Sequence, residues 1–171
     1  MSRVFIGVGS NQGDRLALIS QAARLLGAAE GVRLLRMATI LETEPVGGPP
    51  QEPFLNTVVE LETARTPQEL LVVLKEIERT LGRLPSAVRW APRPIDLDLL
   101  LYDDRIVNDP NLVIPHPRLH ERGFVLEPLS QLASDLIHPV LGQTIGHLLQ
   151  SLKRSNLEDA DVRRSGGADC R

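Results

Sequence analysis

Residues 95–102, with the sequence IDLDLLLY, are the stretch from which the fold can be worked out. Apolar and acidic residues alternate at its start, as in a strand with one face against a core. Residues two apart on a strand point the same way, so the carboxylates of Asp96 and Asp98 should stand side by side. Three apolar side chains should face the core instead: Ile95, Leu97 and Leu99.

The segment before this strand predicts a helix over residues 66–81. Thr66 is placed to cap it, Pro67 takes the first helical position, and Glu69 completes a capping box. Gly82 ends the helix. Between these signals the apolar residues recur at helical spacing: Leu70, Leu71, Leu74, Ile77 and Leu81.

The remaining elements complete an α+β pattern. Further towards the N-terminus, the sequence predicts a strand at 4–9, a helix at 14–29, and strands within 32–43 and at 54–63. Downstream it predicts an irregular stretch at 107–117 and short helices at 124–132 and 144–152. The order βαββαβ is the split βαβ pattern of a ferredoxin-like sandwich, with a mostly antiparallel sheet and helices packed on one face.

This pattern predicts one domain over residues 1–154. From residue 155 to 171 apolar residues are sparse, and we expect a disordered tail.

Composition excludes several classes of protein. Of the 171 residues, 42% are hydrophobic, and no apolar run approaches the ~20 residues of a membrane helix. The net charge of −3 provides no basic footprint for nucleic acid. The one cysteine, Cys170, rules out a disulfide framework within the chain and favours a reducing compartment. We therefore expect a cytoplasmic protein that binds neither nucleic acid nor membrane. We also expect it to be a monomer.

The pair Asp96 and Asp98 is the sharpest chemical signal. Two adjacent carboxylates repel each other unless a cation or a shared proton intervenes. Magnesium is often held by one or two carboxylates together with substrate phosphates. The alternative is an ordinary edge strand with two solvated acids.

Arginines surround this pair in the sequence. Flexible basic loops on either side of a carboxylate pair suit a polyphosphate ligand. Arg79 and Arg105 are more simply read as solvated surface charges. Residues 79–122 contain seven arginines: Arg79, Arg83, Arg89, Arg93, Arg105, Arg118 and Arg122.

The chain has only five rings of the Phe, Trp and Tyr type, and three of them fall at loop edges. Phe54, Trp90 and Phe124 could each stack on a flat ligand, or each could cover a core boundary. Asn56 would share a strand face with Phe54, where its amide could read the polar edge of a heterocycle.

Common nucleotide motifs are absent. The sequence contains no GxxxxGK[ST] motif, which excludes a P-loop. The run from Gly7 to Gly13 has GxGxxxG spacing, one residue longer than the dinucleotide fingerprint. We interpret it as a strand end that turns into a helix.

Together these motifs make the chain resemble the 6-hydroxymethyl-7,8-dihydropterin pyrophosphokinases of folate biosynthesis, from about residue 4 to residue 139. The resemblance implies transfer of the β,γ-diphosphate of ATP to the pterin hydroxymethyl group, with two magnesium ions and AMP as the other product. The matching pieces are GSN (9–11), TEPVG (43–47), PFLN (53–56), GR (82–83), RWAPRPIDLDLLLY (89–102) and IPHPRLHERGFVLEPL (114–129).

The resemblance also implies a role for individual residues. Magnesium would be bound by Asp96 and Asp98. The catalytic residues would be Arg83 and Arg93, which stabilise the migrating diphosphate. The reaction chemistry itself, apart from the resemblance, calls for a base, which we expect to be one of the two aspartates and assign to Asp98. ATP would contact Glu78, Arg89, Trp90, Arg93, the backbone at Leu99, His116 and Arg122. The pterin would contact Thr43, Val46, Gly47, Phe54, Asn56, Trp90 and Phe124.

The chain departs from the family pattern at a few positions. Pro85 stands where some members have a further arginine, and Pro117 stands where they have an aromatic residue. Lys75, Asn111 and Val113 also differ from the ATP-contacting residues expected there. These departures affect ATP affinity and the motion of loops 44–53 and 83–94, which we expect to close over the substrates.

Two other classes remain as alternatives. A non-catalytic ferredoxin-like module for RNA would need rings on the sheet and a basic surface, and this sequence provides neither. An inactive relative is disfavoured because both aspartates, both catalytic arginines and both pterin-type phenylalanines are present.

Overall fold

A computed structural model describes residues 1–45, 47–86 and 88–165 of the chain. Its centre is an antiparallel sheet with the strand order β2-β4-β1-β5, and the short β3 pairs with β4 beyond the end of β2. The strands are β1 (Ser2–Ser10), β2 (Val32–Met37), β3 (Leu41–Thr43), β4 (Phe54–Thr63) and β5 (Asp96–Tyr102).

The connections confirm the βαββαβ prediction. Helix α1 (Arg15–Ala28) leads from β1 to β2, and β4 is inserted between these two strands. Helix α2 (Pro67–Thr80) leads from β4 to β5, and β1 is inserted between them. Two split βαβ units therefore interlock, which makes every neighbouring pair of strands antiparallel.

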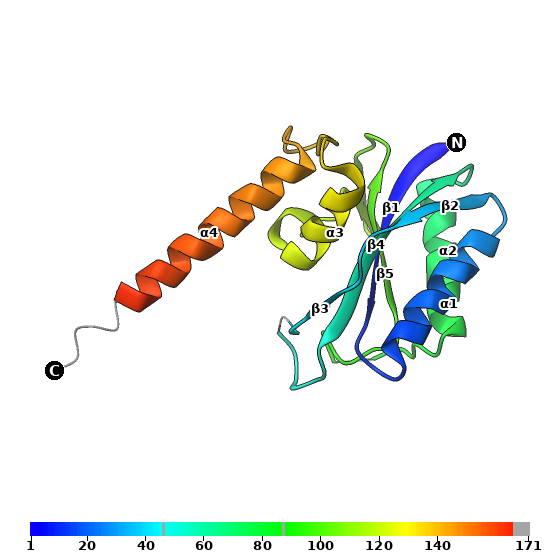
Figure 1. Cartoon of the computed structure of the whole chain (residues 1–171). Helices are drawn as coiled ribbons and strands as arrows, with labels where there is room; N and C mark the ends of the chain where they lie inside the picture. Colours follow the sequence, from blue (N-terminus) through cyan, green and yellow to red (C-terminus); the bar gives the residue numbers. More distant parts are fainter. Residues whose placement is uncertain (46, 87, 166–171) are drawn as a thin grey trace.

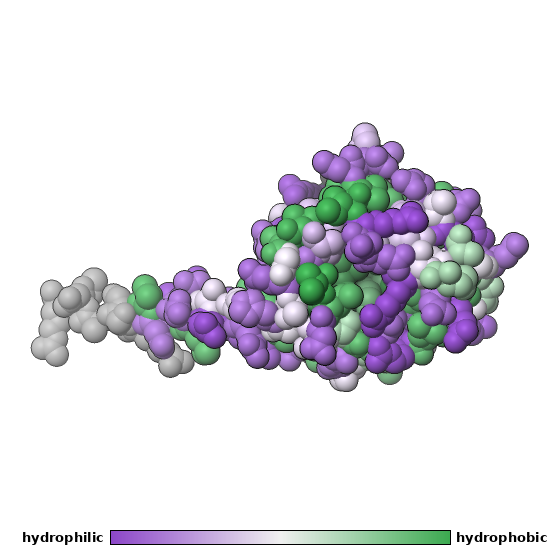
Figure 2. Space-filling model, turned by 90° about the horizontal axis from the view of Figure 1, so that it is seen from above, coloured by the Kyte–Doolittle hydropathy of each residue, from purple (hydrophilic) through white to green (hydrophobic). Residues whose placement is uncertain are grey.

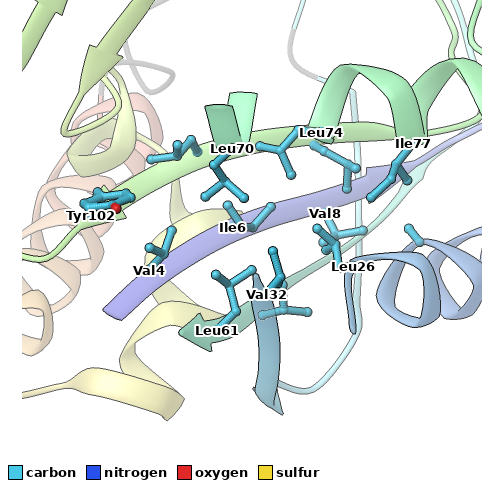
Figure 3. Close-up of a cluster of buried hydrophobic side chains, with 14 of the residues drawn as sticks. Val4, Ile6, Val8, Leu26, Val32, Leu61, Leu70, Leu74, Ile77 and Tyr102 are labelled. Carbon is cyan, nitrogen blue, oxygen red and sulfur yellow. The ribbon is translucent and has the colours of Figure 1, made fainter. Parts of the chain in front are cut away.

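Helices α1 and α2 cover one face of the sheet (Figure 1). Among the described residues, the core between these helices and the sheet is built from aliphatic side chains together with the ring of Tyr102 (Figure 3). Alternate residues of β1, namely Val4, Ile6 and Val8, point into this core together with Leu97 and Leu99 of β5, as the sequence predicts.

The other face of the sheet is also covered, so the prediction of helices on one face only was wrong. Helices α3 (Gly123–Ala133) and α4 (Ile145–Ser165) pack there with the short helix η1 (Leu119–Glu121) (Figure 1). Phe5, Val58 and Leu100 contribute the strand side of this second core. The central strands are apolar on both faces and therefore need a layer on each side.

A buried carboxylate helps to hold α3 in place. Glu60 of β4 is 4% exposed and accepts hydrogen bonds from Arg3 (2.6 Å) and Arg36 (2.8 Å). Arg36 also donates to the backbone oxygen of Leu132 at 2.8 Å. The Arg36 side chain, held by Glu60, thus connects β2 directly to the end of α3.

Two further segments differ from expectation. The stretch 107–117 is not wholly irregular, because β6 (Val107–Asp109) and β7 (Leu112–Ile114) form a two-stranded sheet. The tail is helical through Ser165, and residues 166–171 lie outside the described part. The exposed residues after 152 include several good helix formers, so propensity rather than burial accounts for this extension.

Helix α4 projects away from the body of the molecule (Figure 1). Most of its visible surface is polar, with isolated apolar side chains (Figure 2). Within the described residues, no helix is long and apolar enough to cross a membrane.

The capping box of α2 provides a test of local stability. Thr66 accepts from the backbone N–H of Glu69 at 3.2 Å, and the Glu69 carboxylate accepts from the backbone N–H of Thr66 at 2.8 Å. Thr66→Ala should lower the free energy of unfolding by about 1 kcal/mol. For a chain of this length, that corresponds to a fall in Tm of roughly 2–4 °C.

The matched control is Thr66→Ser, which keeps the hydroxyl and should unfold at nearly the wild-type temperature. Equal losses in the two variants, measured by thermal unfolding, would show that the cap hydrogen bond is not what Thr66 contributes.

Candidate active site

A cavity of about 210 Å³ opens on the α3 side of the sheet, beside the N-terminus of α3. Strand β1 forms part of its floor, where Gly7 and Gly9 replace larger side chains. A Cβ atom on Gly9 would lie 2.9 Å from the amide oxygen of Asn56. The predicted residues that line the cavity are Thr43, Gly47, Phe54, Asn56, Trp90, Arg93, Asp96, Asp98, Arg122 and Phe124.

The two aspartates stand opposite these glycines. Asp96 pairs with Gly9 and Asp98 pairs with Gly7 across the β1–β5 ladder, so both carboxylates enter the cavity. Burial and the charge of Asp96 raise the pKa of Asp98 to about 7. Strand β5 is an edge strand, but these side chains are not the solvated acids of the alternative interpretation.

The carboxylate pair fits a hard divalent cation. Asp98 accepts no hydrogen bond from the described residues, and a cation beside it would relieve its repulsion from Asp96. No group of three or more His, Cys, Asp or Glu side chains in the described residues could hold a metal ion. An ion at this pair would therefore take its further oxygens from water or from a ligand, as magnesium commonly does with nucleotide phosphates.

Two arginines offset the negative charge of Asp96. Arg83 donates to Asp96 at 2.8 Å, and an Arg93 nitrogen lies 3.3 Å from its second oxygen. Burial lowers the pKa of Arg83, but the charges of Asp96 and Glu78 outweigh this effect, and the pKa is raised overall. Arg83 is thus a fixed cation beneath the cavity rather than part of its lining.

Glu78 lies deeper than its predicted contact with ATP implies. Its side chain is 4% exposed, and one oxygen accepts from Arg83 at 2.8 Å and from the backbone N–H of Leu97 at 2.9 Å. Glu78 therefore joins helix α2 to strand β5 and holds Arg83 against Asp96. Helical periodicity could not show this contact, because Arg83 and Leu97 lie beyond the helix.

Aromatic and amide groups form the opposite end of the cavity. Phe54 and Phe124 come from β4 and from the first turn of α3, and both line it. Asn56 donates to the hydroxyl of Thr43 at 2.5 Å, which fixes the orientation of its amide. The Arg93 guanidinium lies 5.5 Å from the centre of the Phe54 ring and so reaches from the acidic end to the aromatic end.

Trp90 joins the cavity in a left-handed backbone conformation, with φ of 58°. Two guanidinium groups lie near its ring, that of Arg89 at 4.2 Å and that of Arg118 at 5.7 Å from the ring centre. A Cβ atom on Gly47 would lie 2.7 Å from the same ring, so glycine is required there. Arg89 itself is exposed and does not line the cavity.

The remaining predicted residues are placed around the cavity or outside it. The Leu99 side chain belongs to the core on the α1–α2 face, while Arg122 lies 5.6 Å from the Phe124 ring. His116 does not line the cavity, and its backbone N–H donates to the oxygen of Leu100 at 2.9 Å. Val46 falls outside the described residues.

Several lining residues were missed as site residues in the sequence. Gln51 lies in the Pro-rich segment, where no pattern distinguishes it from its neighbours. Arg118 and Glu121 were visible as charges after β7, but only tertiary packing brings them to the cavity. Asn11 is 2% exposed and supports the site from beneath, a role that its turn position did not reveal.

His116 provides a pH-dependent prediction. Burial, and secondly the charge of Arg122, lower its pKa to about 4, from 6.5 in the unfolded chain. The unfolded state therefore binds more protons below pH 6.5, and this group destabilises the fold as pH falls towards 4. Between pH 7 and pH 5.5, protonation of His116 in the unfolded chain should lower the free energy of unfolding by roughly 1 kcal/mol.

Urea unfolding at both pH values would measure this effect. The loss of stability should be smaller in His116→Asn than in the wild type, and His147→Asn, which changes an exposed histidine, should behave as wild type. A His116→Asn protein that loses as much stability as the wild type would contradict the role of this residue.

Comparison with known proteins identifies the family of this chain. A family model described as 7,8-dihydro-6-hydroxymethylpterin-pyrophosphokinase (HPPK) matches residues 5–134. The chain is 40% identical over 158 residues to the 2-amino-4-hydroxy-6-hydroxymethyldihydropteridine pyrophosphokinase of Methylorubrum extorquens, with 92% of this chain and 98% of that protein covered. The Bacillus subtilis protein of the same name is 42% identical over 132 residues, with 77% and 78% covered.

Solved structures show the same fold. A Plasmodium falciparum HPPK-DHPS chain superposes with a TM-score of 0.73 at 17% identity, and the match covers 94% of this chain and 44% of that one. This chain thus spans less than half of that longer protein. On the match of the family model and the identity to curated relatives, the chain belongs to the 7,8-dihydro-6-hydroxymethylpterin-pyrophosphokinase family.

Proposed function

We propose that this chain transfers the diphosphate of ATP to 6-hydroxymethyl-7,8-dihydropterin in folate biosynthesis, giving the pterin diphosphate and AMP. The observation that carries the proposal is a single cavity with two unlike ends. One end holds the carboxylates of Asp96 and Asp98 among arginines, and the other holds Phe54, Phe124 and Asn56. A pyrophosphokinase of a flat heterocycle needs these two ends in contact.

The aromatic end suits the pterin ring. Phe54 and Phe124 offer ring faces for stacking on a planar heterocycle. The Asn56 amide presents both a donor and an acceptor, and its bond to Thr43 leaves the amide oxygen available to the pterin edge. Arg93 lies between the ends, beside Phe54, where the hydroxymethyl group would meet the phosphates.

The acidic end suits magnesium–ATP. Asp96 and Asp98 would hold two magnesium ions, which would supply charge neutralisation to the phosphates of ATP. Arg93, and Arg83 from beneath the cavity, would stabilise the migrating diphosphate. Arg122 in the cavity lining, with Arg89 and His116 outside it, would bind the rest of the nucleotide. Glu78 supports this end by orienting Arg83.

The chemistry needs position and charge rather than a covalent intermediate. The pterin hydroxyl oxygen forms a bond to the β-phosphorus, the bond from that phosphorus to the α,β-bridging oxygen breaks, and AMP leaves. The hydroxyl proton must pass to a base or to solvent. Asp98 is our candidate base, because its carboxylate enters the cavity where the hydroxyl and the phosphates would meet.

The wider predictions of a cytoplasmic monomer and of a domain ending near residue 154 stand as part of this proposal. The first rests on the composition of the chain. The second rests on the two cores that cover the faces of the sheet.

Release of AMP tests the reaction directly. Purified protein with ATP, magnesium and the hydroxymethyl dihydropterin should release one AMP for each pterin diphosphate formed. Omission of the pterin should abolish AMP release, which separates the transfer from simple hydrolysis of ATP. Folded protein that releases no AMP with all three components present would overturn the proposal.

Asp98→Asn tests the carboxylate pair. Loss of a ligand charge at the metal site should lower turnover by at least roughly 100-fold, and more magnesium should not restore it fully. The matched control is Asp104→Asn, which changes an exposed acid just after β5. Turnover of Asp98→Asn close to that of Asp104→Asn would show that Asp98 does not serve the metal site.

A further inference from the structure

Arg118 lines the cavity, but it has no part in the reaction as proposed above. Among the described residues, the arginines that line the cavity are Arg93, Arg118 and Arg122. Arg93 forms an ion pair with Asp96 at 3.3 Å, within the carboxylate pair. Arg118 instead donates from Nε to the Oε2 atom of Glu121 at 3.4 Å. This positive charge is therefore directed at a carboxylate outside the pair.

Glu121 is a weak partner for Arg118. The two side chains are 41% and 55% exposed, and the distance of 3.4 Å is long for a charge-assisted hydrogen bond. Exposed ion pairs of this kind contribute little to stability, because water screens them. Both residues line the cavity, so an anionic ligand there can replace the Glu121 carboxylate beside Arg118.

The backbone that carries Arg118 is held in place by the sheet and by the second core. The N–H of His116 donates to the oxygen of Leu100 on β5 at 2.9 Å, and the N–H of Arg118 donates to Nδ1 of His116 at 3.2 Å. Leu119 follows directly and is fully buried in the core on the α3 side. Binding at Arg118 therefore requires little ordering of the chain that carries it.

The Arg118 side chain is well placed to receive a phosphate. Its guanidinium carbon lies 5.7 Å from the centre of the Trp90 ring. A guanidinium near an aromatic ring still presents its planar fork of N–H donors, which matches two oxygens of a phosphate.

Positive charge accumulates on this side of the cavity. Burial lowers the pKa of Arg122, the charge of Asp98 opposes this effect, and the charge of Arg118 lowers the pKa further. Arg118 also contributes, after burial and Arg122, to the lowered pKa of His116. Like charges that repel each other favour an anion that lies between them.

We propose that Arg118 binds the phosphate chain of the nucleotide, and that the phosphates displace the Glu121 carboxylate from it. The proposal rests on the function proposed above, which brings a nucleotide into this cavity. The triphosphate carries more negative charge than one carboxylate, and this favours the exchange. The pterin is uncharged, so its binding does not depend on the charge of Arg118.

Equilibrium binding of α,β-methylene-ATP with magnesium tests the contact between Arg118 and the nucleotide. Arg118→Ala should weaken binding of this analogue about tenfold or more, because the substitution removes a charge-assisted contact. Binding of hydroxymethyl dihydropterin alone should change by less than about twofold. The matched control is Arg105→Ala, which removes an exposed arginine 5.1 Å from the Tyr102 ring centre and away from the cavity. The control should bind both ligands as the wild type does.

Magnesium tripolyphosphate separates a contact with the phosphates from a contact with the base or the ribose. Arg118→Ala should lose affinity for tripolyphosphate by the same factor as for the analogue. Tripolyphosphate binding that is unchanged in Arg118→Ala would overturn the phosphate contact.

Two further variants separate charge from packing. Arg118→Met keeps an apolar stem beside Trp90 without the charge, and it should bind the analogue as weakly as Arg118→Ala. Arg118→Lys keeps the charge and should lose less affinity. An Arg118→Met protein with wild-type affinity would show that Arg118 contributes only packing, which would overturn the proposal.

Glu121→Gln tests the displacement. Without the competing carboxylate, the analogue should bind at least about twofold more tightly. In the Arg118→Ala background the same substitution should have no effect, because Glu121 acts through Arg118. An equal gain in both backgrounds would show simple repulsion between Glu121 and the phosphates, and no gain in either would show that Glu121 does not compete. Each of these results contradicts the displacement.

The outcomes separate this proposal from the proposed function. A wild type that binds no magnesium nucleotide overturns both. If the wild type binds the analogue but releases no AMP, the proposed function fails, while weaker binding by Arg118→Ala still supports the role of Arg118. If the wild type releases AMP and Arg118→Ala binds the analogue as Arg105→Ala does, only the role of Arg118 is overturned.

Discussion

The repulsion between the carboxylates of Asp96 and Asp98 is the constraint around which this molecule is arranged. Both groups stand on one face of β5, opposite two glycines of β1. Arg83 and Arg93 offset the charge of Asp96, whereas Asp98 is left with a pKa raised to about 7 by burial and by its neighbour. Burying two like charges side by side costs free energy, and we propose that binding of a cation and an anionic ligand offsets this cost.

The surrounding fold makes this pair rigid. The other face of β5 is anchored in the aliphatic core beneath α1 and α2, so the direction of the carboxylates is fixed by the burial of Leu97 and Leu99. The hydrogen bond from the backbone of Leu97 to Glu78 adds a polar connection to helix α2. A site built on a central sheet between two cores holds its charges with little freedom to relax, which favours electrostatic stabilisation of a transferring group.

Local sequence patterns were enough to predict many residues of the candidate site. Strand alternation was enough to place Asp96 and Asp98 on one face, because that rule depends only on backbone geometry. The scarcity of rings made Phe54, Trp90 and Phe124 conspicuous, and all three line the cavity. The patterns did not distinguish a residue that contacts the cavity from one that supports it.

The sequence by itself determined the order βαββαβ of the central sheet and its two helices, the capping of α2, the acidic face of β5 and the family. These follow from short-range rules and from residue motifs that are read along the chain. Only the tertiary structure decided that α3 and α4 cover the second face of the sheet, that Glu78 is buried beneath Arg83, and that Arg118 and Trp90 meet at the cavity. Those contacts link residues that are far apart in the sequence. Packing and charge in three dimensions decide which residues meet, and the local periodicity of the sequence contains no information about them.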